Sequence, residues 1–136
     1  MLVELRIRDY AVVEDLTLEL GPGLNVLTGE TGAGKSIVVG ALSLLLGERA
    51  SAGVVRGGAD RAAVEAVFDL EGRPDLAALV ESLGFRLEDG LLILRREVAA
   101  QGRNRAWVGG SPATASLVGE LGSALVDLHG QHEHQT

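Results

Sequence analysis

The stretch of this chain best suited to chemistry is the glycine-rich run 29–36. It matches the pattern G-x-x-x-x-G-K-[ST] at every fixed position. Glycines let the backbone curl so that consecutive N–H groups point at phosphate oxygens. In this pattern Lys35 reaches the β- and γ-phosphates of a nucleotide, and the Ser36 hydroxyl binds Mg²⁺. The residues expected to bind ATP are Gly29, Glu30, Thr31, Gly32, Ala33, Gly34, Lys35 and Ser36.

The lysine content of the chain supports this interpretation. Lys35 is the only lysine among 12 basic residues, so the rest are arginines. A compact ammonium group suits a phosphate cradle, whereas the planar guanidinium fork suits bidentate pairs. The alternative is a glycine-rich turn that only caps a helix.

Two elements must position this loop. The apolar run Leu24–Thr28 is typical of a short buried strand, and Ile37–Leu46 is typical of a helix. Strand, loop and helix in that order form the context that the motif requires. The helix is apolar nearly all round, which predicts burial, and Gly40 within it predicts close packing against a neighbour. Gly47 is expected to end it in a left-handed conformation.

The other elements indicate an α/β protein. Alternating apolar and polar residues predict strands at 3–7 and 16–20. Residues 62–70 alternate in the same way and are expected to form a strand, although their alanine and glutamate content would also allow a helix. Pro74 is expected to begin a helix that Gly84 ends, and Asp89-Gly90 predicts a hairpin between 85–88 and 91–98. We expect a P-loop NTPase with a mixed sheet and an antiparallel β-subdomain.

The C-terminal third is predicted as strand, helix, strand. Residues 104–108 form the first strand, and Ser111-Pro112 would cap a helix that ends near Leu121-Gly122. Ala124–Leu128 is expected to be a short buried strand.

Composition bounds the protein class. A chain of 136 residues is one domain or part of one, and 46% hydrophobic with 3% aromatic residues indicates an aliphatic core. No cysteine is present, which excludes disulfides and thiolate metal sites and suits the cytoplasm. No apolar run has transmembrane length. The net charge of −7 argues against a large nucleic-acid surface on this piece.

All three histidines lie in the polar segment after that last strand. Three interpretations of this segment stay open. In the first, His129, His132 and His134 bind a metal. In the second the segment is a solvated tail, and in the third it forms a loop that presents Gln131 to the γ-phosphate and Mg²⁺.

Residues 25–36 and 127–135 together resemble the bacterial DNA-repair members of the ABC ATPases that are similar to structural-maintenance-of-chromosomes (SMC) proteins. The resemblance implies that 1–136 is the N-terminal half of an ATPase head, with Gln131 as the Q-loop glutamine that contacts Mg²⁺ and the attacking water. It implies a missing coiled coil and a missing C-terminal lobe that carries the signature motif and the Walker B acid. By the same resemblance, two heads dimerise around ATP, the complete protein acts on DNA at the nucleoid, and this chain alone is inactive.

Two alternatives belong to other classes. One is a stand-alone phosphotransferase in which Asp127 is the metal-binding acid. The other is a clamp element that binds ATP without hydrolysing it.

Overall fold

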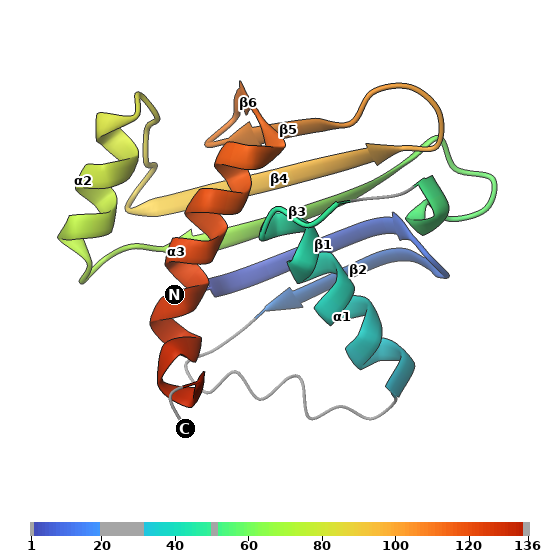
Figure 1. Cartoon of the computed structure of the whole chain (residues 1–136), viewed down its shortest axis with the longest axis horizontal. Coiled ribbons are helices and arrows are strands. Elements are labelled where there is room, and N and C mark those ends of the chain that lie inside the picture. Colours follow the sequence, from blue (N-terminus) through green and yellow to red (C-terminus); the bar gives the residue numbers. More distant parts are fainter. Residues whose placement is uncertain (1, 20–31, 50–51, 135–136) are drawn as a thin grey trace.

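The computed structural model describes residues 2–19, 32–49 and 52–134, and at 32–35 and 126–134 it describes the backbone. Three α-helices alternate with strands along these residues (Figure 1). The elements are β1 (Leu2–Tyr10), β2 (Val13–Glu19), α1 (Gly32–Leu45), the 3-10 helix η2 (Ala52–Val54), β3 (Arg61–Asp69), α2 (Pro74–Ser82), β4 (Leu91–Ala99), β5 (Arg105–Val108), β6 (Ser111–Ala113) and α3 (Ala115–His134).

The described strands form one sheet in the order β2-β1-β3-β4-β5-β6, and each neighbouring pair is antiparallel. Ile7 at the centre of β1 lies opposite Leu16 of β2 and Val64 of β3, so the apolar residues of all three strands share one face. The predicted antiparallel part of the sheet is confirmed. The strand expected at 24–28 lies outside the described residues.

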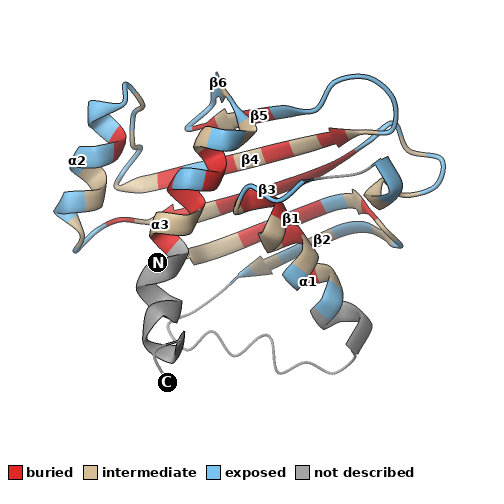
Figure 2. Cartoon of the chain, viewed as in Figure 1, coloured by how far each residue is buried: buried red, intermediate tan, exposed pale blue. Residues whose placement is uncertain are grey.

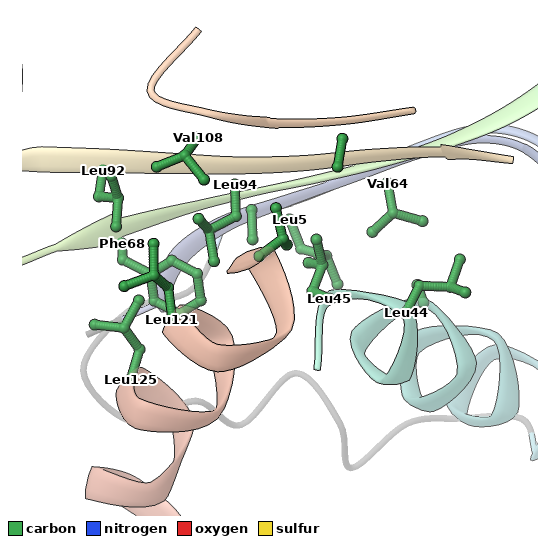
Figure 3. Packing of buried hydrophobic residues seen from close by; sticks show 14 of the residues in the cluster. Leu5, Leu44, Leu45, Val64, Phe68, Leu92, Leu94, Val108, Leu121 and Leu125 are labelled. Atoms are coloured by element: carbon green, nitrogen blue, oxygen red, sulfur yellow. The ribbon is translucent and has the colours of Figure 1, made fainter. Parts of the chain in front are cut away.

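Helices α1 and α3 pack side by side on that apolar face (Figure 1). Figure 3 shows Leu44 and Leu45 of α1 and Leu121 and Leu125 of α3 pointing at the sheet, with Phe68 beside Leu121 and Val64 above Leu44. The inner sides of the helices and strands are accordingly buried (Figure 2). The result is a two-layer domain with an aliphatic core, as the composition predicted.

The opposite face of the sheet carries charged side chains. Arg95 on β4 makes ion pairs with Glu65 (3.0 Å) and Glu97 (2.8 Å), and Arg61 pairs with Glu97 (3.1 Å). The Arg95 guanidinium also lies 5.6 Å from the ring centre of Trp107. This alternation of apolar and charged faces is what the period-2 pattern predicts for a sheet covered on one side.

The hairpin expected around Asp89-Gly90 is only partly formed. The turn is present, but residues 85–88 make a single bridge, between Glu88 and Leu91, while β4 pairs with β3 and β5. The predicted helix after Pro74 is confirmed as α2, with Val80 buried.

The predicted helix start at Ser111-Pro112 is wrong. These residues form β6, in which Ser111 pairs with Val108 across the Gly109-Gly110 turn. The cap belongs to Thr114, whose Oγ1 accepts a hydrogen bond from the Leu117 N–H at 3.0 Å.

The predicted strand Ala124–Leu128 is also wrong, because α3 continues through it to His134. Val118, Leu121 and Leu125 are buried at spacings of three and four, which is the period of a helix face packed on a core. Among the described residues, no helix is both long and apolar enough to cross a membrane.

Candidate functional site

The candidate site is built on the start of α1. Gly29, Glu30 and Thr31 lie outside the described residues, whereas Gly32, Ala33, Gly34 and Lys35 form the first turn of the helix. Ser36 follows and is exposed. The predicted helix after the loop is therefore confirmed, and it begins inside the motif itself.

The chemistry of this helix end suits an anion. The first N–H groups of a helix have no partner within it and carry partial positive charge. The first turn of α1 contains no acidic residue that would compete for these groups. Backbone donors, an ammonium-bearing residue and an exposed hydroxyl-bearing residue are the donor set that a nucleotide triphosphate with Mg²⁺ needs.

The middle of α1 is seated against β1. A Cβ placed on Gly40 would lie 2.5 Å from the Tyr10 Oη, so the helix and the phenol ring approach at a distance that glycine alone allows. The close packing predicted for Gly40 is confirmed. Burial raises the pKa of Tyr10. The sequence did not identify Tyr10 as the neighbour, because the pairing joins two distant segments.

The C-terminal end of α1 is closed by a Schellman motif. The Glu48 N–H donates to the Ser43 carbonyl at 3.1 Å, and the Gly47 N–H donates to the Leu44 carbonyl at 3.2 Å. Gly47 has φ +92°, the left-handed conformation expected for it. A second donor reaches the same end of the helix: Arg96 Nη1 lies 2.9 Å from the Leu44 oxygen.

Sequence reasoning missed Arg96, although a signal was present. Strand β4 places Leu92, Leu94, Arg96 and Val98 on its inner face. A charged residue in an inward position of an alternating strand indicates a special role for that residue.

Helix α3 crosses α1 where α1 ends. A Cβ on Gly119 would lie 2.7 Å from the Gly47 Cα, and one on Gly122 would overlap the Leu45 carbonyl oxygen. The two backbones are therefore in direct contact at this crossing.

Gln131 and the three histidines lie in the last turns of α3. The argument that placed Gln131 after a core strand is wrong, since this segment is helical. The crossing of α1 and α3 lies at the opposite end of α1 from Lys35. Its role stays a prediction that rests on the motif. The possibility that the three histidines bind a metal also stays open, because the structure describes only their backbone. Among the residues whose side chains are described, no group of three His, Cys, Asp or Glu could hold a metal ion.

These features define the class of protein. Residues 4–99 match the AAA domain family, and the chain belongs to that family of ATPase domains. A helix whose first turn completes a phosphate-binding motif is the feature that nucleotide binding in such a domain requires.

The chain is also similar to DNA repair protein RecN. It is 50% identical to RecN of Halalkalibacterium halodurans over all of its 136 residues, which are 24% of that relative. It is 43% identical to RecN of Bacillus subtilis over 99% of its length, covering 23% of that relative. The resemblance to the bacterial DNA-repair group is confirmed, and the chain spans about a quarter of the length of these relatives.

Solved structures agree on the fold. An SMC ATPase studied for ATP-driven dimerization and DNA-stimulated activation superimposes with a TM-score of 0.70 at 23% identity, over 92% of this chain and 79% of that one. The SMC head domain of Thermotoga maritima gives a TM-score of 0.60 at 19% identity, over 86% of this chain and 40% of that one. The expected fold class, an ABC/SMC-type head lobe, is confirmed.

Proposed function

We propose that this chain is the N-terminal, ATP-binding lobe of a DNA-repair ATPase, and that residues 29–36 bind the phosphates of ATP together with Mg²⁺. The observation that carries the proposal is the start of α1 at Gly32, inside the motif, with no acidic residue in its first turn. Membership of the AAA domain family supports it independently.

In this proposal the residues act by position and charge. The N–H groups of the first turn of α1 donate to phosphate oxygens, and Lys35 places its ammonium group beside the β- and γ-phosphates. Ser36 supplies a hydroxyl ligand for Mg²⁺, which neutralises phosphate charge when it is bound. Gln131 orients the attacking water and supplies an amide oxygen to the metal.

The remaining parts come from outside this chain. About three quarters of the RecN relatives lies beyond the matched region, since the chain covers 24% of the first of them. We propose that a C-terminal lobe supplies the signature motif and the Walker B acid, that two heads form a homodimer around ATP, and that the complete protein acts on DNA at the nucleoid in the cytoplasm. RecN relatives are DNA repair proteins, and the SMC ATPase with the same fold is described as dimerising with ATP.

The phosphate-binding assignment is tested by calorimetric titration with MgATP. Because half of the nucleotide contacts would come from another lobe, the affinity of this chain alone is expected to be low. Lys35→Ala should weaken it by about 10-fold or more, since a charge-assisted hydrogen bond is lost. Arg49→Ala is the matched control, because it removes one exposed cation just beyond the other end of α1. Equal affinities for the original chain and Lys35→Ala would overturn the assignment.

The role of Gln131 is tested in a head that includes a complementary C-terminal lobe, because this chain alone should show no ATPase above background. Gln131→Ala should slow turnover about 10- to 1,000-fold and leave ATP affinity nearly unchanged, as expected for one lost water-positioning contact. Unchanged turnover would refute the Q-loop role. If this chain alone hydrolyses ATP and Asp127→Asn abolishes that turnover, the phosphotransferase hypothesis would be favoured instead.

A further inference from the structure

Arg96 is the one charged side chain in the core formed by the described residues, with 3% of its surface exposed. Its Nη1 donates to the Leu44 carbonyl of α1 at 2.9 Å. Its Nε has no hydrogen-bond partner among the described residues. Burial lowers the pKa of the guanidinium, although not enough for an arginine to lose its charge at neutral pH.

A stability role does not explain this arrangement. Burying a cation costs several kcal/mol, and replacing it with an apolar side chain of similar size is often neutral or stabilising. The Leu44 oxygen also accepts the Gly47 N–H, so the end of α1 is closed without Arg96. What Arg96 adds is a directional bond from β4 to the negative end of the α1 dipole.

We propose that Arg96 is a positioning residue that fixes α1 on the sheet and thereby sets where the phosphate-binding end of the helix lies. This proposal rests on the proposed function of residues 29–36. A helix of 14 residues behaves as a rod about 20 Å long, so an axial shift at one end is transmitted to the other.

The close approaches of Gly40 to Tyr10 and of Gly47 to Gly119 limit such a shift sterically, whereas the apolar contacts of α1 with the sheet restrain it less. Val38, Ala41 and Leu44 pack by burial, which is non-directional and tolerates sliding and small rotations. A charge-assisted hydrogen bond to one carbonyl of the last turn selects one axial position. Arg96 thus fixes the axial position of α1 on the sheet, which the apolar contacts alone do not determine.

The test compares Arg96→Met with Arg96→Lys in the full chain, with MgATP as the probe. Both the dissociation constant for ATP and the urea unfolding midpoint are measured. Arg96→Met should keep or raise the midpoint and weaken ATP binding about 5-fold or more, the lower end of typical coupling between sites. Arg96→Lys keeps one donor for the Leu44 oxygen and should restore most of the affinity.

Leu92→Ala is the control for stability alone. Leu92 is fully buried on the same face of β4 but lies at the end of the core away from Leu44 (Figure 3). The Leu92→Ala variant should have a lower unfolding midpoint, while the ATP affinity of its folded form should be unchanged. If Arg96→Met does not fold, Arg96→Gln gives the same comparison with a neutral polar side chain.

The outcomes separate the two proposals. Unchanged ATP affinity in Arg96→Met, or equal losses in Arg96→Met and Arg96→Lys, would overturn the positioning role while the Lys35 result stands. If the original chain binds ATP no better than Lys35→Ala does, the proposed function is overturned instead. The basis for the role of Arg96 is then lost as well.

Discussion

Replacing Gly40 by alanine tests how α1 is seated, because the outcome depends on a single atom of Tyr10. A Cβ at position 40 would lie 2.5 Å from the Tyr10 Oη but 3.5 Å from the Tyr10 Cζ, and 3.5 Å is ordinary contact. In the Tyr10→Phe background the same methyl group therefore meets no clash. Gly40→Ala should therefore stabilise the protein when residue 10 is phenylalanine but not when it is tyrosine.

The expected change in the free energy of unfolding on Gly40→Ala is the sum of two opposing effects. Alanine is favoured over glycine in a helix by about 1 kcal/mol. Overpacking of a well-packed site costs about 1–3 kcal/mol. Gly40→Ala should thus be neutral to about 2 kcal/mol destabilising beside tyrosine, and about 1 kcal/mol stabilising beside phenylalanine. The interaction energy of the pair should be about 1–3 kcal/mol.

Four proteins form a double-mutant cycle: the original chain, Gly40→Ala, Tyr10→Phe and the variant with both changes. Urea unfolding of the four measures that interaction energy directly. A change of 1 kcal/mol should move the thermal midpoint by roughly 3–5 °C for a chain of this size. If Gly40→Ala has the same effect on stability in both backgrounds, α1 does not contact Tyr10 at Gly40. The position of α1 on the sheet, and with it that of the candidate site, would then be refuted.

Two further predictions concern the helix crossing and the outer face. Gly122→Ala should destabilise the protein by more than about 1 kcal/mol, because its methyl group would overlap the Leu45 carbonyl oxygen; a higher thermal midpoint would contradict the crossing of α1 and α3. Burial alone would raise the pKa of Glu97, but hydrogen bonds from Arg95 and Arg61 outweigh it and lower the pKa below its usual 4.5. Glu97→Gln should therefore cost about 1 kcal/mol at pH 7, and that cost should disappear as the pH falls through the lowered pKa, which unfolding curves between pH 2 and 7 would show.

Much of the fold could be predicted from the sequence because the local signals agreed with the tertiary pattern. The strand around Ile7 alternates strictly, the buried positions 64, 66, 68 and 70 follow the same period, and the helix after the phosphate loop has an unambiguous glycine stop. The start of the candidate site was predicted for the same reason, since the motif carries its own structural context.

The errors arose where one local signal fits two structures. Ser111-Pro112 and Thr114 are both good helix caps, and the choice depends on whether Ser111 can pair with Val108 across Gly109-Gly110. The short apolar run at Ala124–Leu128 suits a strand or a buried helix, and length and period must decide between them. Here the spacing of Val118, Leu121 and Leu125 carries the helical period through the run.

The inward position of Arg96 could be predicted from the alternation of β4, but its partner could not. Its partner is a backbone carbonyl of Leu44, 52 residues away along the chain, and a backbone carbonyl leaves no mark in a sequence.

The order of strands in the sheet has a consequence for how the chain folds. The pairs β1–β2 and β5–β6 are joined by tight turns, so they can form rapidly, whereas β1 must find β3 across more than 50 residues, as in the pair Arg8 and Ala63. Helix α1 lies within the loop that this pairing closes, and it packs on β3 and β4. We therefore expect α1 to dock only after β1 and β3 have met, so that its amide hydrogens become protected from exchange later than those of the β1–β2 hairpin. The element that carries the nucleotide site would then be assembled on a sheet already formed beneath it.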